Sequence, residues 1–591
     1  MRIIFEDYFY DSHLIEGLLP RDLLSWSADE ERAKTTYVGY HFSNTIDEPV
    51  FILPKVFIDA NWKPFGKEEL VKEELLNGID IDNILGKEDA LTISRLSFWL
   101  YQAINKYAEK NPKTTILRSA NIQEIKSVGD YSCSTLIEVI QSLRCFNHDH
   151  QNLFTFIVNQ NRSGVHNIDW NKTITKVKPL IQDARPIYWD FINKKKNINF
   201  DEEIIVLFYS VMEYLKGKYY FDEPVNFNFN LLSVDQVQDL IDYETGTIYL
   251  DKIRHKYFTD KLVQLWQLLY VFFEKEQQIA SKGYHEEDVL ATSFNNVFED
   301  MIDQLIGSND LAAVKKNKDG KIIDHLYRDD SLINNGQVYY IADSKYYKES
   351  SDLGENSVYK QFTYARNIIQ HNLNIFQKDS DDEHYLPAMR DELTEGYNIV
   401  PNFFIRASAV GIDGVYDYEK SYLENEFEKD YGKTVTDEIT REQIENKLVN
   451  YHFANRLFDR DTLVLQTYNI NFLYVLAKYV EGGDEIVKAA IRKQFRLDLI
   501  QRFDALYNFY KLSPKDDTSS LEELVDKHFR ILNGRVICPE KDCGYLILAL
   551  EKENITTKDY SLYRKSNLIL EALRDFKHER FDICKVNGLK Y

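Results

Sequence analysis

A short segment, YYIADSKYYK at residues 339–348, places two opposite charges inside an apolar, aromatic run that is typical of a buried strand. Successive side chains of a strand point to opposite faces, so Asp343 and Lys345 share one face. An acid and a lysine on an edge strand can form an ordinary surface ion pair, and the tripeptide alone does not distinguish that case from a functional site. The neighbouring segments therefore carry the argument.

The preceding segment, KIIDHLYR at residues 321–328, also has an acid in an apolar run, Asp324. A turn-like DDSLINNG separates the two segments, which predicts a hairpin that brings Asp324 beside Asp343. Two adjacent carboxylates repel each other unless one is protonated or a cation bridges them. Oxygen ligands with open positions for water and phosphate suit Mg²⁺, and Lys345 could then assist an attacking water.

Helices are predicted on both sides of this hairpin. Val289 to Ile306 is predicted as an amphipathic helix that ends at Gly307. Glu299 and Asp300 lie about equally far from its apolar stripe, so helical geometry does not choose between them. Asp329 and Asp330 remain alternatives to Asp324.

A second helix is predicted from about Val358 to Gln370, with Gln361 near its start. Taken alone, such a glutamine is an ordinary solvated residue. The order of helix, acid, acid-x-lysine and helix is nevertheless that of a PD-(D/E)xK nuclease. The pattern therefore favours a metal-dependent nuclease over a surface ion pair.

Four blocks, in this order, resemble the LlaJI-type restriction endonuclease family, which is related to the McrC nuclease subunits of McrBC-like restriction systems. The resemblance covers about residues 286–480, and its blocks are IIDHLYRDDSL, YYIADSKYYK, YKQFTYARNIIQ and YNINFLYVL. One departure is Ile323, which stands where many such nucleases have proline.

The resemblance implies a role for each candidate residue. Glu299 would be the helix acid, Asp324 and Asp343 the metal ligands together with Glu299, Lys345 the catalytic lysine and Gln361 the trailing glutamine of the motif. The implied cofactor is Mg²⁺. The implied fold is α/β, with a PD-(D/E)xK restriction-endonuclease-like core and additional mixed N-terminal and helical C-terminal regions.

A chain of 591 residues is too long for one core, so several domains are expected. Their expected order is an N-terminal McrC-like mixed domain (1–125), a helical or mixed connecting region (126–280), the nuclease domain (281–480) with a helical insertion near 416–450, and a helical C-terminal domain (486–591).

The resemblance implies a magnesium-dependent endonuclease that cleaves double-stranded DNA in defence against phage or other foreign DNA. The chain contains no GxxxxGK[ST] motif. The implied partner is therefore a separate McrB-like AAA+ GTPase, with a DNA methyltransferase as a possible member of the same system. Two rival interpretations are a catalytically inactive DNA-recognition or scaffold subunit and a nuclease that acts without a motor.

The net charge of −23 argues against indiscriminate binding to polyanions, although local basic clusters can still contact phosphates. The best such cluster is a predicted helix face with Lys488, Arg492 and Arg496. Five cysteines are too few for a disulfide framework, and no signal peptide or membrane-spanning segment is predicted. A cytoplasmic protein without membrane contact is expected.

Three weaker patterns are interpreted as incidental. Cys538 and Cys543 lack the second pair that a four-ligand zinc site needs. The cluster of Cys145, His148 and His150 is interpreted as a chance grouping, and Lys194 to Lys196 as a solvated loop.

Overall fold

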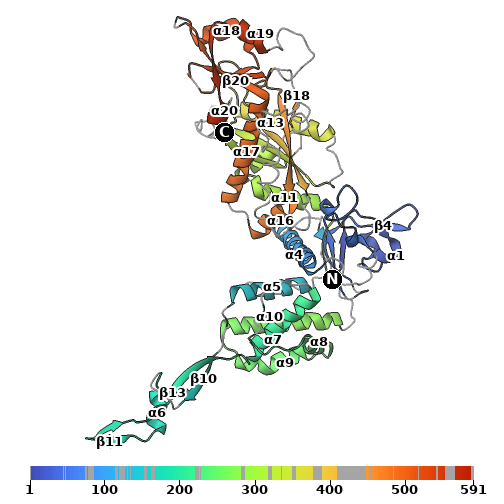
Figure 1. Ribbon diagram of the computed structural model, residues 1–591. Helices are drawn as coiled ribbons and strands as arrows, with labels where there is room; N and C mark the ends of the chain where they lie inside the picture. Colours follow the sequence, from blue (N-terminus) through green and yellow to red (C-terminus); the bar gives the residue numbers. More distant parts are fainter. Residues whose placement is uncertain are drawn as a thin grey trace.

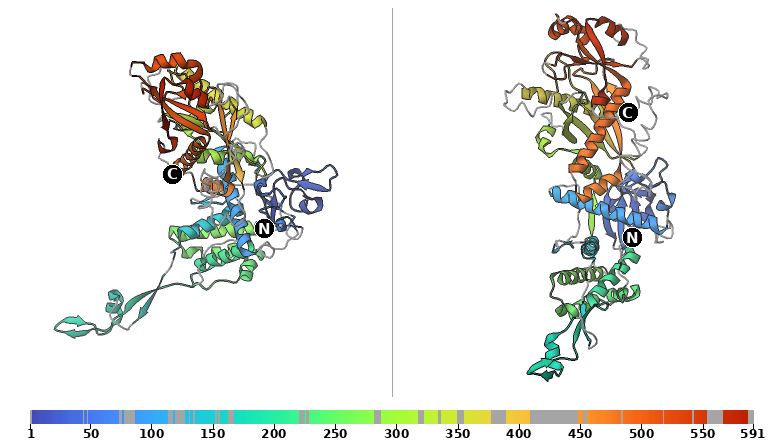
Figure 2. Two further views of the ribbon diagram at one scale, coloured as in Figure 1. Left: turned by 45° about the horizontal axis from the view of Figure 1, so that its top comes forward. Right: turned by 60° about the vertical axis from the view of Figure 1, so that its left-hand side comes forward.

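The structure is a computed structural model. It describes residues 2–586 except for 44, 47, 73–75, 77–85, 113–116, 119–126, 130, 134, 152, 154–155, 162–166, 220–224, 226–227, 281–286, 317–321, 334–335, 349–354, 377–388, 409–447, 452–454, 483–484, 517, 541–542 and 553–565. The protein is mixed α/β and elongated, with an arm projecting from one end (Figures 1 and 2). None of the described helices is long and apolar enough to cross a lipid bilayer.

A five-stranded sheet forms the N-terminal region, in the order β1-β6-β5-β14-β7. Its strands are β1 (Arg2–Phe5), β5 (Val38–Ser43), β6 (Glu48–Leu53), β7 (Leu117–Arg118) and β14 (Asp288–Ala291). Beside it lie the short helix α1 (Ser12–Ile15) and a three-stranded sheet of β2 (Tyr10–Asp11), β3 (Ser25–Trp26) and β4 (Arg32–Lys34). The long helix α4 (Lys87–Lys110) contacts both this sheet and the α/β core.

Strand β14 corrects the helix predicted from Val289. Residues 288–291 pair with β5, with Val289 opposite Tyr40, and the helix begins only at Phe294. Gly39 permits this pairing, because a Cβ there would lie 2.2 Å from the carbonyl oxygen of Val289. The segment predicted to open the nuclease domain therefore begins inside the N-terminal sheet.

Helices fill the next region, and an arm extends from it (Figure 1). The helices are α5 (Leu136–Asp149), α7 (Glu203–Tyr219), α8 (Val234–Asp242), α9 (Gly246–Ile253) and α10 (Asp260–Ala280), with a small hairpin of β8 (Ser127–Val128) and β9 (Tyr131–Ser132). The arm consists of β10 (Phe156–Asn161), α6 (Trp170–Lys176), β11 (Leu180–Gln182), β12 (Arg185–Ile187) and β13 (Asn193–Ile198). Lys194 to Lys196 thus lie on a strand, not in the expected loop.

The α/β core is a second five-stranded sheet, ordered β15-β16-β17-β19-β18. Its strands are β15 (His325–Asp330), β16 (Gln337–Lys345), β17 (Asn402–Ser408), β18 (Leu448–Tyr451) and β19 (Leu463–Asn471). The strand pairs β16–β17 and β17–β19 are parallel, and both edge pairs are antiparallel. The helices of this region are α11 (Phe294–Ile306), α12 (Ala312–Lys315), α13 (Glu355–Phe376) and α16 (Phe472–Glu481).

Most of the insertion predicted near 416–450 lies outside the described residues. Its last residues, from Leu448, form the edge strand β18 and not a helix.

The C-terminal region combines helices with a four-stranded sheet, which corrects the expectation of a helical domain. The sheet order is β21-β22-β20-β23. The elements are α17 (Glu485–Leu506), β20 (Tyr507–Pro514), α18 (Leu521–Leu532), β21 (Val536–Ile537), β22 (Leu546–Glu551), α19 (Ser566–Ala572), β23 (Phe576–Phe581) and α20 (Ile583–Val586).

Candidate functional site

The predicted hairpin between the two acid-bearing segments is confirmed. β15 and β16 pair antiparallel, with His325 opposite Ala342, so Asp324 directly before β15 comes beside Asp343 near the end of β16. Asp343 is fully buried, at 0% exposure, on a strand that has neighbours on both sides. A charged side chain in such a place needs compensating partners, since burying an unpaired charge is costly.

Asp324 and Asp343 lie within hydrogen-bonding distance once one carries a proton. Burial, this contact and the nearby charge of Glu299 raise the pKa of Asp324 to about 9. Burial opposes ionisation of Asp343 as well, but the contact with Asp324 and the ammonium of Lys345 lower the pKa of Asp343. Without a cation, the two opposite pKa shifts therefore favour a protonated Asp324 beside an ionised Asp343.

Two lysines face the Asp343 carboxylate from different elements. Lys345, two residues along the same strand, forms an ion pair with Oδ2 of Asp343, as the alternation of side chains predicts. Lys360, from the second turn of α13, places Nζ 3.9 Å from Oδ1. The Lys345 side chain is 12% exposed and that of Lys360 41%, so Lys360 has the readier access to a ligand from solution.

Glu299 and Asp300, which helical geometry left equivalent, have different surroundings. Glu299 is close enough to Asp343, Lys345 and Lys360 to interact with them electrostatically. Its burial and, to a smaller extent, the negative charge of Asp343 raise the pKa of Glu299. Asp300 points elsewhere: its Oδ2 accepts hydrogen bonds from the Tyr479 hydroxyl and from Lys110 Nζ. Of the two helix acids, Glu299 is therefore the one beside the site.

The alternatives to Asp324 lie at the far end of the hairpin. Asp329 is opposite Val338 and Asp330 opposite Gln337, whereas Asp343 is at the other end of β16. Neither can share a ligand with Asp343 across this pairing. The structure thus brings together Asp324 and Asp343.

Gln361, the residue directly after Lys360 on α13, is completely buried. Neither its amide nitrogen nor its amide oxygen has a hydrogen-bond partner among the described residues. Leaving such a group unpaired costs about 1–3 kcal/mol. An unpaired buried amide, one residue after a lysine that faces Asp343, is a feature that a bound ligand could satisfy.

The paired acids Asp324 and Asp343 offer oxygen ligands of the kind that a divalent metal ion takes. Within the part of the chain that is described, no group of three or more His, Cys, Asp or Glu side chains is arranged to hold one. Asp324 and Asp343 form a pair, and neither oxygen of Asp343 accepts a hydrogen bond from a backbone amide or hydroxyl group there. Two carboxylates suit Mg²⁺, which keeps several waters and takes further ligands from a phosphate.

The basic helix face predicted to contact DNA instead packs inward. On α17, Arg492 donates to the carbonyl oxygens of Ile306 and Gly307 at the end of α11, at 2.9 Å each. Arg496 donates to the carbonyl oxygens of Asp330 (3.1 Å) and Ser331 (2.9 Å). Lys488 is buried and paired with Glu485 at 3.1 Å. These contacts leave the predicted DNA-binding role of this face without support.

Sequence reasoning missed Lys360. Its signal was its place one residue before Gln361 in YKQ, but a lysine at a helix start is usually solvated. His325 was also missed. It is buried, its Nδ1 lies 3.3 Å from Asp303 Oδ1, and it interacts electrostatically with Glu299.

The weaker cysteine patterns gain no metal-binding partners in the described parts of the chain. The Sγ atoms of Cys538 and Cys543 lie 3.4 Å apart without a disulfide bond, and Cys145 and Cys584 form no disulfide bond either.

Comparison with protein families, with curated proteins and with solved structures finds no match to this chain.

Proposed function

We propose that this protein is a magnesium-dependent endonuclease of the PD-(D/E)xK kind that acts on double-stranded DNA. The observation that carries the proposal is the burial of Asp343 between Asp324 and two lysines. Costly buried charges of both signs, gathered at one end of a strand, favour a reacting site over a structural ion pair. The order α11, β15, β16, α13 also agrees with a restriction-endonuclease-like core.

In the proposed reaction Asp324 and Asp343 hold the ion, with Glu299 in support. When bound, Mg²⁺ would polarise a phosphoryl oxygen and lower the pKa of a coordinated water. Asp324 and Asp343 would then both be ionised, because a bound cation would offset the repulsion between their carboxylates.

The lysines and the glutamine have separate roles in this proposal. Lys345 stabilises negative charge that develops on the phosphate and orients the attacking water. Lys360, the more exposed of the two, binds the incoming DNA phosphate. Gln361 positions the attacking water or a phosphate oxygen with its otherwise unpaired amide.

A motor partner of the AAA+ GTPase type, with or without a methyltransferase in the same system, belongs to this proposal. The projecting arm supports a protein partner in the first half of the chain (Figure 2). Exposed apolar side chains gather there, namely Trp170, Ile174, Leu180, Ile181, Ile187 and Trp189. Clusters of exposed apolar side chains mark interaction surfaces.

A second candidate is a subunit that retains this fold without catalysis. The observation that favours this candidate is that the described residues contain no group of three or more side chains arranged to hold a metal ion. Such a scaffold would bind DNA or a partner without cleaving a phosphodiester.

Plasmid nicking with Mg²⁺, with and without a nucleotide-hydrolysing partner, separates the candidates. Cleavage by the wild type that is lost in Asp343→Asn supports the enzyme. Asp329→Asn is the matched control, because it removes an acid from the opposite end of the same hairpin. DNA binding without cleavage under any of these conditions would support the scaffold.

A further inference from the structure

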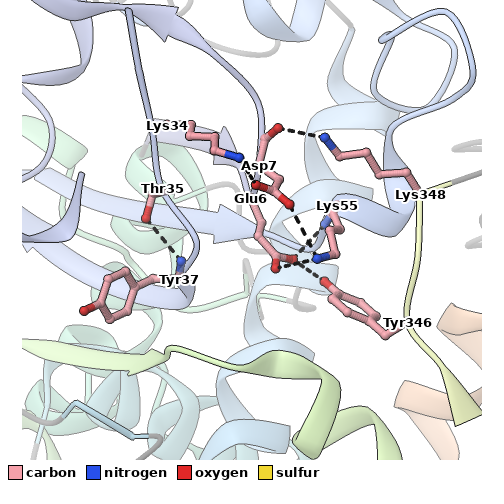
Figure 3. A network of polar contacts seen from close by, with 8 residues as sticks. All are labelled: Glu6, Asp7, Lys34, Thr35, Tyr37, Lys55, Tyr346 and Lys348. Carbon is pink, nitrogen blue, oxygen red and sulfur yellow. Dashed lines mark hydrogen bonds and ion pairs between the residues drawn. The ribbon is translucent and has the colours of Figure 1, made fainter. Parts of the chain in front are cut away.

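The end of the strand that carries Asp343 and Lys345 is tied to the N-terminal region. Figure 3 shows Tyr346 and Lys348 pointing toward the residues that follow β1. The Tyr346 hydroxyl donates to Oε2 of Glu6 at 2.5 Å, and both side chains are buried. Lys348 Nζ donates to the carbonyl oxygen of Asp7 at 2.8 Å. Two contacts therefore hold the chain directly after Lys345.

Glu6 is itself held in place, so it is a fixed anchor for Tyr346. The backbone N–H of Lys55 donates to Oε2 of Glu6 at 3.1 Å, and Lys55 Nζ lies 3.5 Å from both Glu6 Oε1 and Asp7 Oδ2 (Figure 3). Lys34 Nζ donates to Asp7 Oδ1 at 2.6 Å. Buried charged networks in which every member is paired are rigid.

The ring of Tyr346 makes a second set of contacts, with the helix that carries Glu299. It lies 5.5 Å from the ring of Phe294 and 6.0 Å from that of Phe298, both on α11, and 6.5 Å from that of Phe472 on α16. Helix α11 in turn starts three residues after β14 of the N-terminal sheet. The elements bearing Glu299, Asp343 and Lys345 are thus attached to the N-terminal region.

The pairing of β16 with β17 ends at Lys345 and Arg406. Beyond that pair, the orientation of the strand end depends on side-chain contacts. Tyr346 is the next residue and points to the opposite face from Lys345, so fixing its side chain fixes the backbone that aims the lysine.

We infer that Tyr346 is a positioning residue, which through its hydroxyl bond to Glu6 makes the placement of Lys345 depend on the N-terminal region. This inference rests on the proposed nuclease function. It also supplies a route by which a protein bound to the N-terminal region would alter cleavage, because displacement of Glu6 would be transmitted to the strand end.

The test compares Tyr346→Phe with Tyr340→Phe in the full-length protein. Both substitutions remove one buried hydroxyl and keep the ring, one directly after β16 and the other within it. The Tyr340 hydroxyl donates to the carbonyl oxygen of Asp330 at 2.7 Å. Asp330 is opposite Gln337, at the end of β16 far from Lys345. Lys348→Met removes the second tie as an additional variant. We expect Tyr346→Phe to lower kcat for cleavage about tenfold or more with little change in KM, and Tyr340→Phe to leave kcat unchanged.

Amide hydrogen exchange across residues 341–348 supplies a readout that does not need activity. Faster exchange at the strand end in Tyr346→Phe, together with a lowered kcat, supports the inference. Equal kcat in the wild type, Tyr346→Phe and Lys348→Met would overturn it while leaving the nuclease assignment intact. A wild-type protein that binds DNA and never cleaves it would overturn the proposed function, and this inference with it.

Discussion

Asp324, directly before β15, lies within hydrogen-bonding distance of Asp343 on β16 once one of the two carries a proton. The pKa of Asp324 is raised to about 9 from a usual 3.8, so the folded protein retains a proton that the unfolded chain releases above about pH 4. The stability from this group is complete below that pH and is lost as pH rises toward 9. In metal-free buffer, unfolding by denaturant should show stability falling across this range.

Mg²⁺ should compete with that proton. The rise in melting temperature on adding Mg²⁺ should therefore be larger at about pH 8.5 than at about pH 5.5. Asp324→Asn removes the titrating group, so both the pH slope and most of the Mg²⁺ effect should disappear in thermal unfolding. A Mg²⁺ effect of equal size in this variant would place the ion elsewhere.

Gln361→Leu should stabilise the protein and weaken its activity. The substitution replaces an unpaired buried amide with an apolar side chain of similar size, which should raise the free energy of unfolding by about 1 kcal/mol. If the amide contacts the reacting groups, cleavage should fall at least about tenfold. Denaturant unfolding and cleavage assays measure the two effects. A gain in stability with full activity would make Gln361 a structural residue only.

Lys360→Met should weaken DNA binding more than it changes stability. Its ammonium is partly exposed and faces Asp343. Its loss should therefore reduce the slope of log affinity for DNA against log salt concentration by about 1. Arg366→Gln on the same helix is the control, because Arg366 pairs with Asp461 at 3.4 Å. DNA affinities measured at several salt concentrations check this, and equal slopes in both variants would contradict a phosphate contact.

Arg492→Ala should destabilise the protein without changing its affinity for DNA. The guanidinium donates hydrogen bonds to two carbonyl oxygens at the end of α11. Without these donors, the free energy of unfolding should fall by about 1–3 kcal/mol. Denaturant unfolding and DNA binding are the two measurements. Weaker DNA binding with unchanged stability would restore the DNA-contact interpretation of this helix face.

Local sequence patterns were sufficient to predict the hairpin and to place Asp343 and Lys345 on one face of a strand. Alternation along a strand and the turn between two apolar runs depend on neighbouring residues only. Local patterns could not decide whether Glu299 or Asp300 lies beside the site. That choice depends on Tyr479 and Lys110, which bind Asp300 and are distant in sequence.

Two further differences between the expected and the observed surroundings have the same physical origin. Leu290 lies four residues before Phe294 and so continues the apolar stripe of the predicted helix, but residues 288–291 pair with the distant β5 and form a strand. The cations at positions 492 and 496 have the spacing of an exposed helix face, yet carbonyl groups of α11 and β15 occupy them. Tertiary contacts outweighed local preference in both cases.

The most direct measurement is Mg²⁺-dependent cleavage of plasmid DNA by the wild type and by Asp343→Asn, with the motor partner present and absent. We predict that the wild type cuts in at least one of these conditions and that Asp343→Asn is slower by at least about a hundredfold while still binding DNA. Equal cleavage by the two proteins would contradict the assignment of the site.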